Sequence, residues 1–441
     1  MCDTFYIPPH LTRDGQAIFA KNSDREPNEA QHLVRYPRQF RDTDEVKATY
    51  ITVPHNREIF EVILSKPFQM WGAEMGINEN QVVIGNEAVF TRMPIARKND
   101  GLTGMDLIRL ALETSRSAEA ALRHICRLVE SYGQDACGGY TNRNFFYHNS
   151  FIIADPREAY VLETAGRFWV YRKLRSYYAI SNRLSITHEW DGISDGAIDF
   201  AGKKGWSKGM KDFSFADAFS APLMSRLSMA VKRRECSMMH LGSLQGTAGL
   251  QDAFKVLRSH AVDHGFDPSD GRMDSLCLHA TGLLTPSQTT GSMVTVLRKD
   301  AQPSIWATGS SAPCLSVFKP FYFDDDVLDG KNFRLPSARA DQSYWWQWER
   351  WHRKALCQYT HAHELAHNLF YPLEDRWVEF HERSKEGDTD RAILRKASAA
   401  CVSESLDLLG NALDQLKENG KYRGWFYRYH WRKWNREAGI K

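Results

Sequence analysis

Short β-rich runs, each ended by a turn signal, fill the first hundred residues of this 441-residue chain. From the N-terminus they read CDTFYI, QAIFAK, ATYITV, IFEVILS and QVVIGNEAVF. Pro, Asn and Asp-Gly signals separate the runs, and short segments rich in β-branched and aromatic residues are typical of strands. The chain is therefore predicted to begin with antiparallel sheet.

The apolar period changes to that of a helix between residues 103 and 132. Thr103 and Asp106 form a capping-box arrangement, and Leu107, Leu110 and Ala111 fall on one stripe. Strand patterns return in NSFIIAD, AYVLETA, FWVYRKL and YYAISN, and later in GSMVTVL and SIWATG. Strands, a helical pair and further strands predict an α+β fold of two packed sheets with outer helices.

The predicted domain organisation follows from where this patterning stops. Around DDDVLDGKNFRLPSARADQ the apolar periodicity disappears, which predicts a connector over 326–340. Residues 1–325 are expected to form the main domain. Residues 341–441 are expected to form a helical extension rich in aromatic and arginine residues.

Composition limits the partners that the chain can have. The net charge of +3 is too small for nucleic acid to be indicated as the main partner. No stretch reaches the roughly 18 uninterrupted apolar residues that a membrane span requires, and no secretion signal is recognisable at the start. The protein is therefore expected to be cytoplasmic, without integral membrane association and without nucleic-acid binding.

Eight cysteines are scattered along the chain without a CxxC pair. This spacing indicates neither a zinc ribbon nor a dense disulfide framework. Seven of the cysteines are expected to be buried thiols that pack as small hydrophobic groups. Cys2 differs because it directly follows the initiator methionine.

Cys2 is predicted to lie close to a polar segment from later in the chain. The pair Asp14-Gly15, between CDTFYI and QAIFAK, predicts a hairpin that returns the segment KNSDR toward Cys2. Removal of Met1 is expected because cysteine is small. The freed α-amine, with a pKa of about 7.7–8.0, could then accept the proton of the thiol, whose pKa is about 8.5.

The charged residues of KNSDR have plausible tasks beside such a cysteine. Asp24 could orient the α-amine, and Lys21 or Arg25 could favour the thiolate by lowering the pKa of the thiol. The alternative is that Cys2 belongs to a frayed terminus and KNSDR is an ordinary polar turn.

Seven stretches together resemble a known family. They are MCDTF, FAKNSDREPNE, MWGAEMGINENQVVIGNEAVFT, GMDLIRLALE, NSFIIADPREAYVLETAGRFW, YAISNRLSI and SVFKPFYF. Over roughly residues 2–323 the chain resembles the secernin and bacterial dipeptidase family of N-terminal-nucleophile hydrolases. More distantly, its layout is similar to that of penicillin V acylase and the bile salt hydrolases.

The resemblance implies a four-layer αββα sandwich, with 1–325 as the catalytic domain, and amide hydrolysis through an acyl-enzyme. It implies that Cys2 is the nucleophile, that Lys21 stands beside it and that Asp24 holds its α-amine. No metal or organic cofactor is needed for this chemistry.

The resemblance also implies roles for three further residues. Asn86, in IGNEAVF, and Asn182, in AISNRL, match asparagines near the nucleophile, where an amide N–H can stabilise an oxyanion by about 3 kcal/mol. Each asparagine could instead be a turn residue. Arg226 resembles a supporting arginine, or is a surface residue of a helix. Gln81 stands where the family has glycine, so a positive φ there would cost about 1–2 kcal/mol.

The predicted activity is cleavage of an amide bond in a small substrate, a dipeptide or an N-acyl amino compound. The alternative is a non-hydrolytic secernin-like protein whose extension binds a partner or a membrane. A homo-oligomer is compatible with either function.

Two features of the extension favour other functions. The segment HELAH (363–367) satisfies HExxH, which on a helix would bind zinc, although no third ligand is clearly placed. The tail KYRGWFYRYHWRKWNREAGIK interleaves basic and aromatic residues, as do segments that bind anionic membranes or single-stranded nucleic acid. Its aromatic residues could instead dock on the catalytic domain or on a sister subunit, as could those of SYWWQWERW.

Overall fold

A computed structural model describes the chain except residues 222–227, 263–264, 284, 385–390, 418–419 and 441. The chain forms two compact units. Unit 1 comprises residues 1–21, 36–249 and 297–302, and unit 2 comprises residues 22–35, 250–296 and 303–441. Each unit combines antiparallel strands with helices.

The larger sheet of unit 1 has the strand order β15-β13-β12-β11-β10-β9-β8. These strands are β8 (Val62–Pro67), β9 (Met75–Asn78), β10 (Val83–Val89), β11 (His148–Ala154), β12 (Ala159–Ala165), β13 (Phe168–Lys173) and β15 (Gly192–Ile193). Neighbouring strands run antiparallel, with Gly85 opposite Ile152 on β10 and β11. The strands predicted over NSFIIAD, AYVLETA and FWVYRKL therefore form one continuous meander, β11-β12-β13.

The N-terminal strand β1 (Cys2–Ile7) lies between β14 (Tyr178–Ile180) and β2 (Ala17–Arg25). The predicted hairpin is present, with Gly15 at a positive φ of 64° in its turn. Strand β1 pairs with β14 so that Thr4 faces Ile180. Two residues further along each strand, this register brings Cys2 opposite Asn182.

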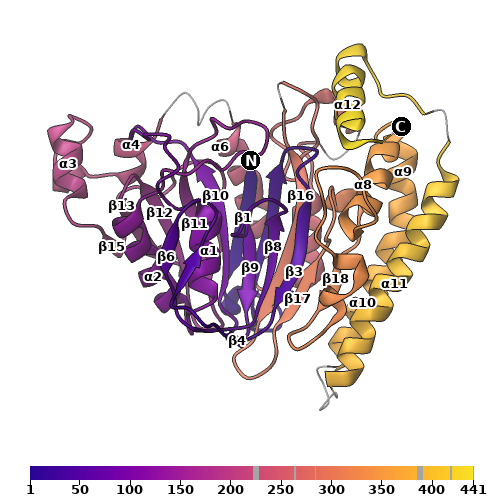
Figure 1. Ribbon diagram of the computed structural model, residues 1–441, viewed down its shortest axis with the longest axis horizontal. Coiled ribbons are helices and arrows are strands. Elements are labelled where there is room, and N and C mark those ends of the chain that lie inside the picture. The colour runs from indigo at the N-terminus through magenta and orange to yellow at the C-terminus, as the bar shows by residue number, and fades with distance from the viewer. Residues whose placement is uncertain (222–227, 263–264, 284, 385–390, 418–419, 441) are drawn as a thin grey trace. The chain divides into compact units, whose positions relative to one another are not determined.

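Helices cover both sides of unit 1. Helices α1 (Gly104–Leu112) and α2 (Ala118–Tyr132) pack on the larger sheet, whereas α6 (Ala230–Ser243) packs on β1 and β14. Because β1 also contacts β10 and β11, the order of layers is helix, sheet, sheet, helix (Figure 1). The predicted α+β fold with αββα layering is therefore confirmed in unit 1.

The predicted start of α1 is also confirmed. The Thr103 side chain accepts a hydrogen bond from the Asp106 backbone, and the Asp106 carboxylate accepts one from the Thr103 backbone. The strand predicted over ATYITV is shorter than expected. Thr49 instead donates both its backbone N–H and its hydroxyl to Asp106, which leaves only β6 (Thr52–Pro54) extended.

Short elements complete unit 1. The strands are β4 (Gln39–Phe40), β5 (Glu45–Lys47) and β7 (Glu58–Ile59), and the helices are α3 (Ala197–Lys203) and α4 (Phe215–Phe219). Within the described residues of the chain, no helix is long and apolar enough to cross a membrane.

Unit 2 contains strands and a group of helices. Its strands are β3 (Gln31–Tyr36), β16 (Gln288–Leu297), β17 (Ser304–Ala307) and β18 (Lys319–Phe321), and its helices are α7 (Leu250–Arg258), α8 (Tyr344–Ala355), α9 (Tyr359–Leu365), α10 (Tyr371–Ser384), α11 (Arg391–Gln415) and α12 (Trp425–Ala438). Helices α10 and α11 pack on β18, and α8 packs on α9 and α11 (Figure 1).

The aromatic residues of the extension dock within their own unit. The indole N–H groups of Trp345, Trp351 and Trp431 donate to the backbone carbonyls of Thr290, Leu315 and Ala280. The compact units therefore do not follow the boundary expected at 326–340. The helices after residue 341 share a core with segments that precede residue 325.

Candidate active site

Cys2 is buried at the start of β1, with only 5% of its surface exposed. Its backbone N–H donates to Asn182 Oδ1 at 2.9 Å, and its Sγ lies 3.9 Å from Glu74 Oε2. Asn182 holds this position because the β1–β14 register, extended two residues beyond the pair Thr4 and Ile180, brings it opposite Cys2. The structure thus brings together two residues, the predicted nucleophile and the predicted second asparagine, that are 180 positions apart.

With Met1 attached, the pKa of the Cys2 thiol is raised to about 12. Burial is the largest cause; the charge of Lys21 opposes the shift, and the neighbouring carboxylates of Glu74 and Glu87 contribute to it. At neutral pH the thiol therefore keeps its proton. A base must arise close to Sγ before Cys2 can act as a nucleophile.

Asn182 and a buried arginine hold the N-terminus together. Asn182 Oδ1 accepts a second hydrogen bond, from Arg233 Nη2 at 2.8 Å, and Asn182 Nδ2 donates to the Ala88 carbonyl at 2.9 Å. Arg233 Nη1 also donates to the Cys2 carbonyl at 3.2 Å and to Asp3 Oδ2 at 2.6 Å. Both ends of the Cys2 backbone are therefore bonded to this pair.

Arg233 was not identified from the sequence. The predicted supporting arginine, Arg226, lies outside the described residues. Arg233 lies on α6 and is fully buried, on the stripe that also buries Ala230, Ser237 and Leu241. An arginine on the apolar stripe of a helix is rarely buried unless it has a charged partner. This pattern in the sequence could have identified Arg233 as a buried, paired residue.

Lys21 and Glu87 form a buried ion pair beside the site. Lys21 Nζ donates to the Asn86 carbonyl at 2.7 Å and to Glu87 at 3.3 Å, and the Thr4 hydroxyl donates to the same carboxylate. Burial raises the pKa of Glu87 to about 8, although the charge of Lys21 opposes this shift. Glu87 was not predicted. Its carboxylate pairs with Lys21 and so weakens the effect of the Lys21 charge on the pKa of Cys2.

The side chain of Asn86 does not face the nucleophile. Alternation along β10 directs Gly85 and Glu87 toward β1 and β2, and Asn86 toward the opposite face of the sheet. There Asn86 Nδ2 donates to Asn149 Oδ1 at 2.9 Å, against Gly104 of α1. The predicted oxyanion role for this side chain is therefore corrected: Asn86 supports Lys21 through its backbone carbonyl.

Asp24 belongs to unit 2, where its Oδ1 accepts a hydrogen bond from the Thr289 hydroxyl at 2.7 Å. Its predicted role at the α-amine of Cys2 stays a prediction.

Gln81 has the positive φ that was considered from the family resemblance. Its φ is 62°, the left-handed region that glycine adopts without strain. Hydrogen bonds of the side chain offset the cost of this conformation: Nε2 donates to the carbonyls of Arg298 and Ala301, and Oε1 accepts from the Arg298 N–H. A glycine could not make these bonds, which hold the loop 297–302 in place.

The two histidines of HELAH lie on neighbouring helical turns. His363 lies in the last turn of α9 and His367 in a π-helical turn, Ala366–Phe370, with the two ring centroids 4.8 Å apart. Glu364 is exposed and pairs weakly with His361 at 3.9 Å. Among the described residues, no third ligand joins these two imidazoles.

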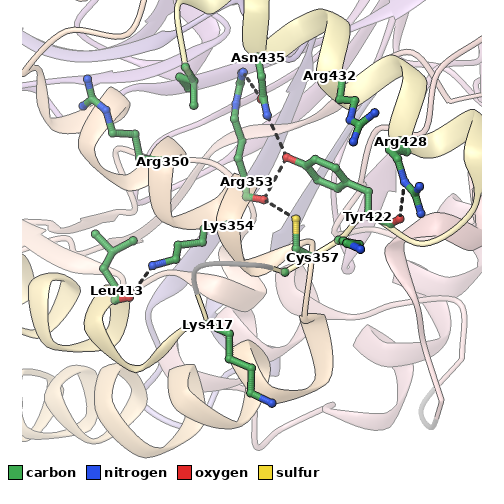
Figure 2. A pocket seen from close by; sticks show the side chains of 13 residues that line it. Arg350, Arg353, Lys354, Cys357, Leu413, Lys417, Tyr422, Arg428, Arg432 and Asn435 are labelled. Atoms are coloured by element: carbon green, nitrogen blue, oxygen red, sulfur yellow. Dashed lines mark hydrogen bonds between the residues drawn. The ribbon is translucent and has the colours of Figure 1, made fainter.

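A basic pocket of about 550 Å³ lies between α8, α11 and α12 in unit 2 (Figure 2). Seven cationic side chains line it: Arg350, Arg353, Lys354, Lys417, Lys421, Arg428 and Arg432. Among the described residues that line it none carries a carboxylate, so these side chains make its electrostatic field positive. None of the predicted catalytic residues that the structure describes lines this pocket.

The raised pKa of Glu87 predicts a pH dependence of stability. A carboxyl whose pKa rises from 4.5 to about 8 on folding stabilises the protein fully below pH 4.5, and this contribution is lost as the pH rises through about 8. The free energy of unfolding is expected to fall over this window by a few kcal/mol more in the wild type than in Glu87→Gln. Urea unfolding at a series of pH values measures this difference.

The exposed Glu45→Gln provides the control, because it should reproduce the wild-type slope. Equal slopes for the wild type and Glu87→Gln would contradict the prediction.

The chain is similar to known proteins in sequence and among solved structures. The family model for peptidase family C69 matches residues 1–229. Among solved structures, the chain is similar to the C2A mutant of conjugated bile acid hydrolase from Clostridium perfringens (10% identity, 75% of this chain and 94% of that chain, TM-score 0.43). It is also similar to penicillin V acylase from Agrobacterium tumefaciens (12% identity, 73% and 87%, TM-score 0.43) and to the Caenorhabditis elegans ortholog of N-acylethanolamine-hydrolyzing acid amidase (11% identity, 67% and 92%, TM-score 0.36).

Proposed function

The chain belongs to peptidase family C69, which makes it an amide-bond hydrolase, and we propose that it cleaves dipeptides with Cys2 as an N-terminal nucleophile. One observation carries this proposal. The backbone nitrogen of Cys2, which becomes an α-amine when Met1 is removed, already has a fixed acceptor in Asn182 Oδ1. N-acyl amino compounds are the alternative substrate class.

In the proposed mechanism, removal of Met1 supplies the missing base. The α-amine of Cys2 accepts the thiol proton, and the thiolate attacks the carbonyl carbon of the substrate. Collapse of the tetrahedral intermediate breaks the C–N bond, and the amine returns the proton to the leaving nitrogen. A water molecule then attacks the thioester, which releases the acid and regenerates the thiol.

Asn182 and Lys21 act on this residue in different ways. Asn182 Oδ1 accepts from the α-amine and so fixes its orientation, whereas an oxyanion role would require Asn182 Nδ2 to leave the Ala88 carbonyl. The charge of Lys21 lowers the pKa of the thiol. Asn182 is thus proposed as a positioning residue for the base.

The proposal is tested by a variant that keeps the thiol and removes the α-amine. Inserting lysine between Met1 and Cys2 prevents methionine removal, because the residue after Met1 is then large. Hydrolysis of a panel of dipeptides and N-acyl amino acids is expected in the wild type and is expected to be lost in the insertion variant. An insertion variant with wild-type turnover would overturn the proposal.

Replacing Asn182 distinguishes its two possible roles. Asn182→Leu is expected to lower kcat by about 10²-fold, because the α-amine is then no longer held in its orientation. Without the acceptor the protonated amine is less favoured, so the acidic limb of the kcat/KM profile should shift to lower pH. A fall in kcat without this shift would instead indicate an oxyanion donor. Asn56→Leu, at an exposed position, serves as the control.

Binding without hydrolysis is the second candidate function, and the basic pocket of unit 2 favours it. An anionic partner would be attracted by the seven cationic side chains that line the pocket. Wild-type protein that starts at Cys2 and yet turns over no member of the panel would favour this function over the first.

A further inference from the structure

Two cysteines and two histidines of unit 2 converge with their side chains. His260 follows α7, Cys277 and His279 precede β16, and Cys314 lies in the 3-10 turn Pro313–Leu315. Their four potential ligand atoms all lie within 4.8 Å of one another. Cys277, His279 and Cys314 are buried, and His260 is partly buried.

The spacing of these atoms matches tetrahedral coordination of a metal ion. His279 Nε2 lies 3.4 Å from His260 Nε2, 3.7 Å from Cys277 Sγ and 3.4 Å from Cys314 Sγ. A tetrahedral zinc ion with Zn–N of about 2.0–2.1 Å and Zn–S of about 2.3 Å separates nitrogen from sulfur by about 3.5 Å and two nitrogens by about 3.4 Å. The three distances from His279 Nε2 therefore match a tetrahedral zinc site, and the remaining ligand atoms lie within 4.8 Å of one another.

Hydrogen bonding alone does not account for this cluster. A neutral imidazole nitrogen carries either one proton or one lone pair, yet three polar atoms lie within 3.7 Å of His279 Nε2. A cation between the four groups would satisfy all of them at once. Thiolate and imidazole ligands in tetrahedral geometry favour zinc over the hard cations magnesium and calcium.

We propose that His260, Cys277, His279 and Cys314 bind one Zn²⁺ ion. Four protein ligands close the coordination shell, so the ion would stabilise the fold and would not activate water. Both thiols lose their protons to solvent when the ion binds.

The backbone holds the ligand segments in place. The Cys277 N–H donates to the Ser259 carbonyl at 3.0 Å, which fixes Cys277 beside the segment that carries His260. Arg258 Nε donates to the Pro313 carbonyl at 2.9 Å, next to Cys314. Segments distant in sequence are thus joined at their ligand residues, which lowers the ordering cost of metal binding.

The zinc site would anchor the helical extension. Trp431 of α12 donates to the Ala280 carbonyl and Trp351 of α8 donates to the Leu315 carbonyl. Each of these carbonyls belongs to the residue directly after a proposed ligand. Fixing the ligands therefore also fixes the acceptors on which two helices dock.

The site also adjoins Asp24. The N–H of Leu278, between two ligands, donates to the Thr289 hydroxyl at 2.9 Å, and that hydroxyl donates to Asp24. If Asp24 holds the α-amine, as the family resemblance predicts, zinc loss will also lower activity. Zinc binding itself does not depend on that function and is measured without it.

Metal analysis of the full chain, purified without chelators or an added histidine tag, tests the proposal. About one zinc ion per chain is expected by inductively coupled plasma mass spectrometry. Cys277→Ser and Cys314→Ser should each reduce the zinc content at least about fivefold. Cys401→Ser, which changes a buried cysteine of α11, and His363→Ala, in HELAH, should retain it.

Spectroscopy on the wild type identifies the metal ligands directly, so the proposal can be tested even if the variants do not fold. Zinc X-ray absorption should show two sulfur and two nitrogen neighbours, and replacement by Co²⁺ should give the visible bands of a tetrahedral thiolate site. Wild-type protein without zinc and without these cobalt bands would overturn the proposal. So would a Cys277–Cys314 disulfide, or zinc that is lost with His363→Ala and retained with Cys277→Ser.

Discussion

Cys2→Ala is expected to lower kcat/KM for amide hydrolysis by at least about 10⁴-fold, with the fold retained. The reason is that one residue supplies the nucleophile in the proposed mechanism, and the site offers no second thiol at that position among the described residues. Binding energy alone cannot replace a covalent intermediate. Steady-state kinetics on the best substrate of the panel measures the effect, and circular dichroism verifies the fold.

The control for Cys2 is Cys126→Ala, which removes a buried thiol from α2. It should cost some stability and leave kcat/KM within about twofold, because a buried free cysteine acts as a small hydrophobic group. A Cys2→Ala enzyme that kept more than about one-tenth of the activity would show that the nucleophile lies elsewhere.

Arg233→Met is expected to be the most destabilising single change at the site. It leaves the Asp3 carboxylate buried without its 2.6 Å partner, and removing one member of a buried pair costs about 3–5 kcal/mol. Burial already raises the pKa of Asp3 although Arg233 opposes this, so the carboxyl should become protonated in the variant. Urea unfolding measures the loss.

Arg233→Met should also lower kcat, because Asn182 and the Cys2 carbonyl lose their shared donor. The neighbouring Arg234→Met removes a hydrogen bond to the Ala179 carbonyl and a cation–π contact with Tyr178, and should cost about 1–2 kcal/mol. Combining Arg233→Met with Asp3→Asn should recover part of the stability, since the buried charge is then gone. Additive losses in the double variant would contradict a coupled pair.

Local signals explain how much of the fold could be predicted. The period of two, the Asp14-Gly15 turn and the capping box at Thr103 act over a few residues, and the structure confirms the hairpin, the strands after residue 148 and the start of α1. The resemblance supplied the layering, which no local pattern contains. The boundary at 326–340 was expected because periodicity stops there, but tryptophans after it bury against earlier segments.

The site was predictable where a residue's place depended on strand register, and not where it depended on side-chain direction. Cys2 and Asn182 meet because β1 pairs with β14. Asn86 lies on the expected strand, but side chains alternate along β10. Glu87 therefore faces Lys21, and the Asn86 side chain lies on the opposite face of the sheet. Arg233 left a readable signal on a buried helical stripe.

The cysteine and histidine cluster shows a different limit. Metal spacing in sequence is recognisable when ligands lie on one short segment, as in CxxC. Here the ligands come from three separate segments, and only the pair Cys277 and His279 is close in sequence. Their convergence depends on how α7, β16 and the turn at Cys314 pack, which no spacing rule contains.

The most direct test of the central claim is mass spectrometry of the enzyme during turnover, quenched in acid to prevent transfer of the acyl group from sulfur to nitrogen. The expected N-terminal peptide begins at Cys2 and carries the acyl part of the substrate as a thioester that hydroxylamine removes. An active enzyme that retains Met1, or an acyl group found on another residue, would contradict the claim.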